Sequence, residues 1–394
     1  MKTSKGNAGC LLIHKGWATA LLWHQCKLLL VFGCMLPSLP SFAGSLIAWG
    51  SGLGTNVPPI LTNVISIAAG LEHCVVILAD GSVSAWGNNS HSQTNVPEGL
   101  SNVVAVSAGA FHCLALSSDG MVTAWGNNYH GQSSVPDGLS NVVAIAAGGE
   151  HSLALRTDGT VINWGKYSDG SPTYFEMPMP ADLTNVIAIA SGSDHDLLLK
   201  SDGTVSAWGL NNFLQTDVPD GLSNVVKIAA GGYHSLVLTS NGTVVGWGRN
   251  DSGESYAPPG VNNLVAIAAG DQHTVGVKSN GTLVAWGHNA DGQTNYPAGI
   301  SNVLAVAAGQ FDSLALIGDA PAIPALRAEA PAYLQGVFSV LVQTRSGKDY
   351  RLEYKDHLDD PVWNELPAQP GDGTLMRLTT PAIVPQRYFR VREL

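Results

Sequence analysis

The sequence predicts an all-β protein, in which a seven-bladed β-propeller closed by its N-terminal strand is followed by a small C-terminal β module. The first observation is a Trp-Gly pair that recurs at steps of 37 to 44 residues. The second is a histidine that recurs at steps of 39 or 44 residues. The third is a set of short alternating apolar runs around Asp-Gly or Asn-Gly turns. Repeats of about 40 residues with three or four strands are typical of propeller blades, so seven copies predict seven blades.

The tryptophan and the histidine locate every copy. The Trp-Gly pairs begin at Trp49, Trp86, Trp125, Trp164, Trp208, Trp247 and Trp286. The marker histidines are His73, His112, His151, His195, His234 and His273, and the seventh copy has Asp312 at this position. Such regular spacing is not expected by chance, so the number of copies is a firm prediction.

Each copy contains three expected strands. In the copy at 141–165, residues 143–147, 152–155 and 160–164 are short runs with apolar alternation, which indicates strands and not helices. Asp158-Gly159 lies between the second and third runs, and this dipeptide favours a tight hairpin because both residues can adopt positive φ. The first run ends in Ala-Ala-Gly. Small residues there suit strands that crowd around a common axis.

The two ends of the repeat array complement each other. Residues 46–50 form a Trp-Gly strand with no marker segment before it, whereas no Trp-Gly strand follows residues 313–316. We therefore expect the N-terminal strand to complete the seventh blade. Closure of this kind leaves no open sheet edge to which another chain could add a strand.

The full motif, G-x-x-H-S-L-A-L-x-x-D-G-T-V-x-A-W-G-x-N-x-x-G-Q, resembles the repeat of the regulator of chromosome condensation family of seven-bladed propellers. The resemblance covers residues 45–318. The unit is short and contains Q-T-x-V-P, as at 93–97. In this respect it is similar to the short bacterial secreted type that β-lactamase inhibitor protein II represents. The first resemblance implies guanine-nucleotide exchange on a small GTPase. The second implies inhibition of an extracellular or periplasmic enzyme.

Three segments flank the predicted propeller at 44–318. Residues 1–43 predict a signal peptide, because lysines precede an apolar run at 28–36 and Ser41-Phe42-Ala43 is a cleavage pattern. The alternative is a membrane anchor, which needs about 20 mostly apolar residues.

Residues 319–332 predict a Pro/Ala linker. Residues 333–394 predict a small β module with strands at 338–342, 350–354 and 388–392. We expect a secreted, periplasmic or cell-surface monomer with no membrane span in the mature chain.

The predicted propeller is acidic. Residues 44–324 contain 6 Lys and Arg against 21 Asp and Glu, which is a formal charge of −15. Proteins that bind nucleic acid present a cationic surface. Nucleic acid is therefore not an expected partner.

The repeated residues are predicted to be structural. Burial of a tryptophan removes roughly 150–250 Å² from water, which is sufficient reason for seven Trp residues packed between blades. The marker histidines are expected to form hydrogen bonds.

Cys74 and Cys113 each follow a marker in adjacent copies. Equivalent positions of adjacent blades are expected to exceed the roughly 7 Å between Cα atoms that a disulfide allows, so we predict two free buried thiols.

The sequence contains no catalytic motif. G-x-S-x-G, H-E-x-x-H, a Walker loop and a C-x-x-C pair are all absent from it. Histidines on different blades are not expected to converge within about 2.0–2.1 Å of one zinc ion. We predict no enzyme activity, no cofactor and no metal site.

The positions at which the copies differ are the candidate binding residues. The interval after Trp164 is 44 residues instead of 39 and adds aromatic and methionine side chains, which suit a binding patch. The alternative is that Phe175 and Met177 pack back on the blade. A second set combines variable loop positions with residues that precede a marker. The partner-binding candidates are Tyr167, Tyr174, Phe175, Met177 and Met179 in the first set, and Tyr129, His130, Phe213, Tyr233 and Phe111 in the second.

The function predicted from these residues is recognition. We expect an exported, non-catalytic propeller that binds a protein, or a glycan, through variable loops on one face. Inhibition of an extracellular or periplasmic enzyme is the alternative. Guanine-nucleotide exchange is a further alternative, which the export signal and the acidic charge oppose.

Overall fold

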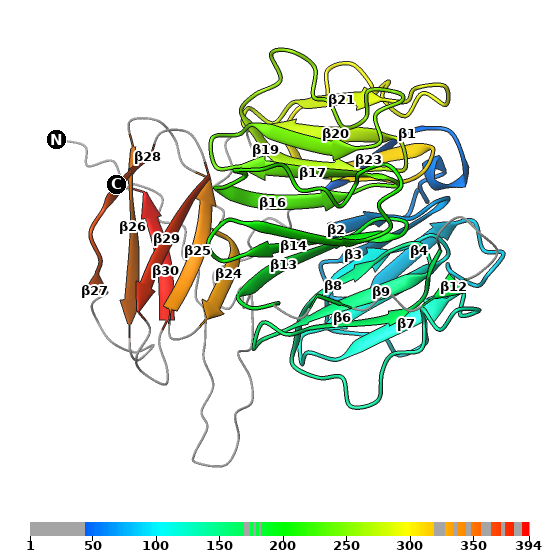
Figure 1. Ribbon diagram of the computed structural model, residues 1–394, viewed down its shortest axis with the longest axis horizontal. Helices are drawn as coiled ribbons and strands as arrows, with labels where there is room; N and C mark the ends of the chain where they lie inside the picture. Colours follow the sequence, from blue (N-terminus) through cyan, green and yellow to red (C-terminus); the bar gives the residue numbers. More distant parts are fainter. Residues whose placement is uncertain are drawn as a thin grey trace. The chain divides into compact units, whose positions relative to one another are not determined.

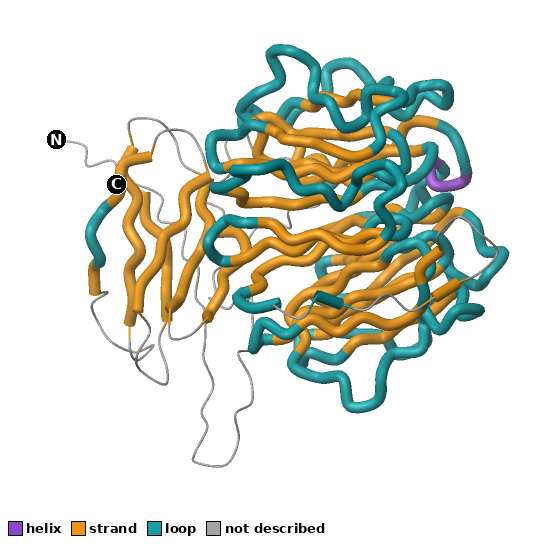
Figure 2. Tube along the Cα trace, in the orientation of Figure 1, coloured by secondary structure: helices purple, strands orange, loops and turns teal. Residues whose placement is uncertain are grey.

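The computed structural model describes residues 44–168, 174–175, 179–180, 183–318, 328–334, 337–343, 348–355, 364–371, 375–381 and 388–393. These residues fall into two compact units, one at 44–318 and one at 328–393. The described secondary structure consists of strands and one short 3-10 turn, η1 Leu53–Thr55 (Figure 2). Within the described ranges no helix has the length and apolar character needed to cross a membrane.

The first unit is a propeller of seven antiparallel three-stranded blades (Figure 1). Each blade has an inner, a middle and an outer strand. Successive inner strands contact each other, and the last inner strand contacts the first, so the ring is closed. The seven-bladed prediction is therefore confirmed.

The strand bounds follow the repeat. The first three blades are β2 Val64–Ala69, β3 His73–Leu78 and β4 Val83–Gly87; β5 Val103–Ala108, β6 His112–Ser117 and β7 Val122–Gly126; and β8 Val142–Ala147, β9 His151–Arg156 and β10 Val161–Gly165. The next three are β13 Val186–Ser191, β14 His195–Lys200 and β15 Val205–Gly209; β16 Val225–Ala230, β17 His234–Thr239 and β18 Val244–Gly248; and β19 Leu264–Ala269, β20 His273–Lys278 and β21 Leu283–Gly287. The seventh blade combines β22 Val303–Ala308 and β23 Asp312–Ile317 with β1 Ser45–Gly50.

The N-terminal strand closes the ring, as predicted. Strand β1 pairs with β23 from Ser45 opposite Ile317 to Gly50 opposite Asp312 (Figure 1). The chain thus joins its two ends within one sheet, because each end of the repeat array supplies the strand that the other lacks.

An asparagine with positive φ precedes every inner strand, at Asn63, Asn102, Asn141, Asn185, Asn224, Asn263 and Asn302. Asparagine tolerates this left-handed conformation better than most residues. The carbonyl of Asn141 accepts a hydrogen bond from the Thr157 N–H at 2.9 Å. This bond ties the start of β8 to the hairpin of the same blade, which explains the Asn-Val pair in the repeat.

The core lies between the blades. Five consecutive residues of each middle strand are buried. All seven tryptophans of the Trp-Gly pairs are buried. Six of them donate Nε1–H to a carbonyl in the loop that follows the preceding blade, at 2.8–3.0 Å: Trp49 to Gln293, Trp86 to Gly54, Trp125 to Gln93, Trp164 to Gln132, Trp247 to Gln215 and Trp286 to Glu254. Their predicted packing role is confirmed.

The described residues of the C-terminal unit form two sheets. One pairs β24 Ala328–Leu334 with β25 Val337–Gln343, and β25 with β29 Leu375–Pro381. In the other, β26 Lys348–Lys355 pairs with β27 Asn364–Glu365, β28 Gln369–Gly371 and β30 Tyr388–Glu393. The three predicted strands of this module are confirmed.

Strand β24 corrects the predicted boundary of the C-terminal module. It begins at Ala328, inside the range expected as linker. The backbone of this Ala-rich segment pairs with β25, and Pro331 falls where the register shifts between Glu329 and Ala332, a position at which a strand tolerates proline. The rest of the predicted linker, at 319–327, and the predicted signal peptide at 1–43 lie outside the described residues.

Candidate binding face

The turn before each marker and the loop after each Trp-Gly pair lie on one face of the propeller, which we call the turn face. In every blade the first residue after Trp-Gly donates its N–H to the carbonyl of the pre-marker residue, at 2.7–2.9 Å. These bonds run from Ser51 to Phe311, Asn88 to Glu72, Asn127 to Phe111, Lys166 to Glu150, Leu210 to Asp194, Arg249 to Tyr233 and His288 to Gln272. The Asp-Gly hairpins lie at the opposite strand ends, on what we call the hairpin face.

Gly126 shows why glycine follows each tryptophan. Its φ is 97°, and a Cβ would lie 2.6 Å from the carbonyl oxygen of Phe111. A larger residue would be strained and would separate the loop from the turn. The glycine therefore brings the loop that carries Tyr129 against the turn that carries Phe111.

Backbone hydrogen bonds join the turns around the propeller axis. The N–H groups of Ala110, Gly149, Ser193, Gly232, Asp271 and Gln310 donate to turn carbonyls of the next blade at 2.9–3.3 Å. The axial cavity that remains is about 110 Å³ and is lined mostly by alanine and glycine. Small-molecule sites usually occupy roughly 300–1,000 Å³, so a large ligand is expected to bind on the face and not within the axis.

The marker histidines connect neighbouring blades by hydrogen bonds, as predicted. Each is fully buried, and its Nε2 contacts the side chain that follows the next marker. The pairs are His73–Cys113 at 3.2 Å, His112–Ser152 at 2.8 Å, His151–Asp196 at 2.9 Å, His195–Ser235 at 2.9 Å, His234–Thr274 at 3.2 Å and His273–Ser313 at 2.8 Å. We call this circle of contacts the interblade belt.

Burial keeps most imidazoles of the belt neutral at pH 7. It lowers the pKa of His73, His195 and His273 to about 4. It also lowers the pKa of His112 and His234 to about 3. Desolvation disfavours the charged form of a buried imidazole, so these side chains serve as neutral hydrogen-bonding groups.

Asp312 completes the belt between the seventh blade and the first. Its Oδ2 accepts a hydrogen bond from the Cys74 thiol at 3.7 Å. Burial raises the pKa of this carboxyl to about 7. Gly54 approaches so closely that a Cβ there would lie 1.8 Å from the same oxygen. The position thus favours a side chain shorter than histidine.

Tyr167 is a buried structural residue, which corrects its prediction as a partner-binding residue. Its side chain is fully buried, its hydroxyl donates to Asp196 Oδ2 at 2.5 Å, and its ring stacks on His151 with centroids 4.0 Å apart. In other blades the side chain after the marker donates to a loop carbonyl, as Ser152 does to Gln132. The carboxylate of Asp196 accepts a hydrogen bond instead of donating one, and the Tyr167 hydroxyl is the donor.

The remainder of the inserted segment is described in part. Tyr174–Phe175 form β12, which pairs with β11 Tyr167–Ser168. Met179 is half-buried against a cluster that includes Trp208. Met177 lies outside the described residues. The segment contains a short β-ribbon, with Tyr167 as its buried anchor.

A first aromatic group on the turn face contains two of the predicted binding residues. The ring centroids of His91 and Phe111 are 4.9 Å apart, and those of His91 and Tyr129 are 6.0 Å apart. Tyr129 is 81 % exposed. His130, beside it, donates its backbone N–H to Gln132 Oε1 at 2.9 Å. Sequence reasoning missed His91, although it occupies the same kind of variable loop position.

A second aromatic group contains Phe213 and Tyr233, also predicted, with ring centroids 5.3 Å apart. The Arg249 guanidinium lies 5.4 Å from the centroid of Phe213. Phe213 is 41 % exposed. Desolvation raises the pKa of Tyr233, and the carboxylates of Asp194 and Asp271 add to this effect. The structure therefore brings these two predicted residues together with charges of both signs.

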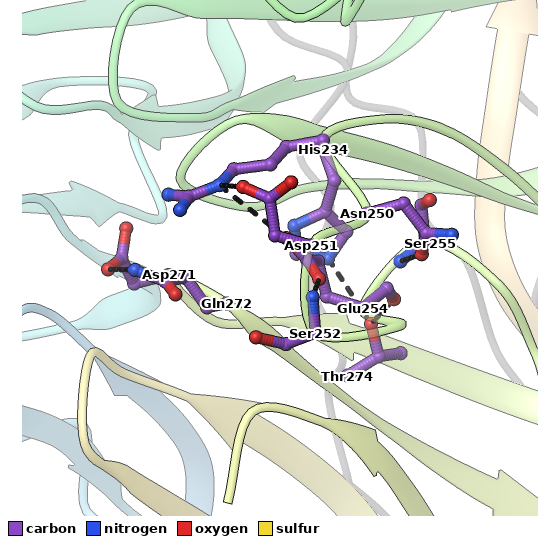
Figure 3. A network of polar contacts seen from close by, with 10 residues as sticks. His234, Asn250, Asp251, Ser252, Glu254, Ser255, Asp271, Gln272 and Thr274 are labelled. Atoms are coloured by element: carbon purple, nitrogen blue, oxygen red, sulfur yellow. Dashed lines mark hydrogen bonds and ion pairs between the residues drawn. The ribbon is translucent and has the colours of Figure 1, made fainter. Parts of the chain in front are cut away.

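Arg249 compensates for a residue change in the repeat. Glu254 occupies the position that is glutamine in four other blades, at Gln93, Gln132, Gln215 and Gln293. Its buried carboxylate accepts the Ser252 N–H at 2.7 Å (Figure 3). Arg249 Nε lies 2.7 Å from Asp251 Oδ2 and 3.9 Å from Glu254 Oε1. The guanidinium thus supplies positive charge beside a carboxylate that water does not reach.

Replacement of Arg249 by alanine is expected to lower the free energy of unfolding by about 1–2 kcal/mol, because the buried Glu254 carboxylate loses its nearby positive charge. The exposure of Arg249 limits the effect. Urea unfolding of the purified protein measures the change. The double variant Arg249→Ala/Glu254→Gln restores the residue of the other blades and should recover most of the loss. Equal losses in both variants would show that Glu254 is not the cause.

Carboxylates lie among the aromatic residues around the axis. The seven pre-marker residues are Glu72, Phe111, Glu150, Asp194, Tyr233, Gln272 and Phe311. Burial raises the pKa of Glu150 to about 7, and the nearby Asp194 contributes. Gln132 Nε2 donates to the Glu150 carboxylate. Sequence reasoning did not include these acids among its candidates. The signal was present, since acidic and aromatic residues mix at one repeat position.

A Cys–His pair and the potential metal-ligating side chains of the described residues bear on whether the propeller could carry out chemistry. His73 and Cys113 form a Cys–His pair, but burial raises the pKa of the Cys113 thiol far above its usual value. A thiol and not a thiolate is therefore present, and it is unreactive. Cys74 and Cys113 are both free and buried, as predicted. No group of three or more His, Cys, Asp or Glu side chains in the described ranges could hold a metal ion.

The closed ring of repeated blades, with variable loops on one face, defines a repeat-built β-propeller. The model of the "Regulator of chromosome condensation (RCC1) repeat" matches residues 64–93, 103–132, 142–170, 186–215, 225–254 and 264–293. The chain belongs to the RCC1-repeat β-propeller family. A comparison with curated proteins found no sequence match.

Solved structures share the fold. Prp20p from Saccharomyces cerevisiae is 24% identical with a TM-score of 0.59, and the match covers 71% of this chain and 92% of that one. Human WBSCR16 is 21% identical with a TM-score of 0.55, with 70% and 99% covered. The receptor kinase CR4 ectodomain of Physcomitrella patens is 26% identical with a TM-score of 0.53, with 66% and 72% covered.

Proposed function

We propose that this chain is an exported, non-catalytic binding protein that recognises a protein partner through its turn face. The observation that carries the proposal is the exposure of aromatic side chains on loops of this face. Tyr129 and Phe213 are 81 and 41 % exposed. Exposed aromatic residues that gather on one surface are typical of interaction sites, where they supply much of the binding energy.

The scaffold suits recognition because its turns are held rigidly. The backbone bonds around the axis and the loop-to-turn bonds fix the turns before a partner arrives. A preorganised surface loses little conformational entropy on binding. Prp20p, which shares the fold, is described by its binding properties to Gsp1p and histones. Both are proteins, which favours a protein over a glycan as the partner here.

Export is part of the proposal. Lysines, the apolar run at 28–36 and Ser41-Phe42-Ala43 form the pattern of a cleaved signal. Cleavage after Ala43 would leave Gly44, which forms a backbone bridge with Val64, directly ahead of β1. The mature chain would then begin where the propeller begins. Mass spectrometry of the exported protein tests this boundary, and an uncleaved N-terminus would contradict it.

Photocrosslinking tests the binding face. A benzophenone amino acid at position 129 or 213 is expected to capture a partner from the envelope or secreted fraction. The same group in place of Met121, which is 51 % exposed beside a hairpin on the hairpin face, serves as the control. Capture from position 121 alone would reject the turn face.

Loss of the exposed rings is expected to weaken the captured complex by about tenfold or more in the double variant Tyr129→Ala/Phe213→Ala, because such residues dominate interface energies. Biolayer interferometry with the identified partner measures the affinity. Met121→Ala is the matched control and should leave it unchanged. If the partner is an extracellular hydrolase whose turnover falls as propeller is added, the binding role is inhibition.

A further inference from the structure

The turn face carries negative charge among its aromatic residues. Neither of the two residues before any marker is lysine or arginine, whereas Glu72, Glu150, Asp194 and Asp271 are all in these turns. Glu72, Glu150 and Asp271 are half-exposed. They can therefore meet a ligand that lies over the axis.

These carboxylates are close enough to act on each other and on the rings between them. Asp194 contributes to the raised pKa of Glu150. Asp194 and Asp271 both contribute to the raised pKa of Tyr233. Charges of one sign that reinforce each other at a partly desolvated surface attract a counter-charged partner more strongly than isolated charges do. The net charge of −15 for residues 44–324 adds to this field.

The aromatic rings of the face also suit a cation. Arg249 already places its guanidinium 5.4 Å from the centroid of Phe213, within the range of a cation–π interaction. This internal contact shows that a guanidinium can lie against an aromatic ring of this face. Arg249 is itself paired with Asp251 and lies near Glu254, so its own charge is largely balanced and leaves the surrounding face acidic.

We infer that the turn face binds a basic segment of its protein partner, with lysine or arginine side chains placed among the axial carboxylates and the flanking aromatic rings. The inference rests on the proposed binding role of this face and adds the charge of the partner. The narrow axial cavity keeps the segment on the surface. The carboxylates favour a positively charged segment, and the rigid turns hold these carboxylates in place before the segment binds.

Fluorescence anisotropy of the full chain with labelled octa-arginine and octa-glutamate peptides tests the inference. Octa-arginine is expected to bind, more tightly at about 20 mM salt than at about 150 mM, because salt screens surface charges. Octa-glutamate is expected not to bind. Absence of octa-arginine binding at low salt would overturn the inference.

Two double variants distinguish binding at the turn face from attraction to the overall negative charge of the propeller. Glu150→Gln/Asp271→Asn neutralises two carboxylates of the turn face. Asp158→Asn/Asp202→Asn neutralises two exposed carboxylates of the hairpin face and changes the net charge equally when the pH is about 8.5, above the Glu150 pKa of about 7. The first pair is expected to weaken octa-arginine binding about tenfold and the second less than about twofold. Equal effects of both pairs would contradict a site on the turn face.

The affinity of the natural partner for the two turn-face double variants tests this inference separately from the proposed function. If Tyr129→Ala/Phe213→Ala weakens the captured complex while Glu150→Gln/Asp271→Asn does not, the turn face binds a partner and the basic segment is wrong. A glycan partner would give this pattern as well. If both double variants weaken the complex, the inference is supported.

Discussion

Acidification from about pH 7.5 to about pH 5 is expected to destabilise the propeller strongly, because the interblade belt contains buried neutral histidines. Unfolded histidine has a pKa near 6.5. In the folded chain, burial lowers the pKa of five of these imidazoles to about 3 or about 4. Below pH 6.5 the unfolded chain therefore binds protons that the folded chain excludes. The stability present above pH 6.5 is lost as the pH falls toward 4.

The size of the effect follows from proton linkage. At pH 5.5 each of the five histidines destabilises the fold by about 1.4 kcal/mol, or about 7 kcal/mol together. Asp312 acts in the opposite direction, since its folded pKa of about 7 lies above its ordinary value. It destabilises the fold as the pH rises, so acidification from about pH 7.5 to about pH 5.5 returns about 2 kcal/mol. Glu150, whose pKa burial also raises to about 7, acts in the same direction, and its partial exposure limits its share to less than about 2 kcal/mol. The net loss of about 3–5 kcal/mol is a large fraction of a total stability of about 5–15 kcal/mol.

Urea unfolding at a series of pH values between about 4 and 8 measures this dependence, with tryptophan fluorescence as the probe. Uptake of five protons by the histidines on unfolding, offset by the protons that Asp312 and Glu150 hold only in the folded chain, gives a limiting slope of about 4 kcal/mol per pH unit. His234→Gln keeps a hydrogen-bonding side chain beside Thr274 and should reduce the slope by about one third. A stability that stays constant from about pH 7 to pH 4 would show that the buried imidazoles do not control acid unfolding.

Replacement of Asp196 by alanine is expected to lower the free energy of unfolding by about 3–5 kcal/mol, because it breaks a fully buried group of polar side chains. Asp196 contacts both His151 Nε2 and the Tyr167 hydroxyl. Without the carboxylate, the His151 imidazole and the Tyr167 hydroxyl both stay buried and lose this hydrogen-bond partner. A loss of this size lowers the midpoint of thermal unfolding by roughly 10 °C, which differential scanning calorimetry measures.

Two variants serve as controls for Asp196→Ala. Asp196→Ser introduces the side chain found after the marker at Ser152, Ser235 and Ser313, which can still contact His151. It is expected to retain about half of the lost stability. Tyr167→Phe preserves the ring stacked on His151 and removes only the hydroxyl, so its effect should be about 1–2 kcal/mol. If Asp196→Ala matched Tyr167→Phe, the contact with His151 would contribute nothing.

The sequence predicted the propeller well because the fold is encoded within each copy. Asp158-Gly159 and Trp164-Gly165 recur with a fixed spacing, and the strands between them alternate in the same way. Such signals depend only on residues close in the chain. The missing strand at each end of the array then required β1 to pair with β23, which the structure confirms.

The candidate binding face was predicted less completely. Phe111, Tyr129, Phe213 and Tyr233 do lie on one face, because the loop after each Trp-Gly pair bonds to the turn of the same blade. Tyr167 was wrong as an exposed residue, because the partner that buries it, Asp196, is 29 residues further along the chain. No local pattern records such a contact.

The sequence alone determined the number of blades, their strand order and the closure of the ring, since these follow from a short repeated pattern of apolar residues and turns. The tertiary structure alone decided which side chains meet across blades. The interblade belt joins residues 40 or 45 positions apart, and Cys74 bonds to Asp312 from 238 positions away. Burial and hydrogen bonding act through space, so the axial carboxylates and their neighbouring aromatic rings became one surface only when the ring was closed.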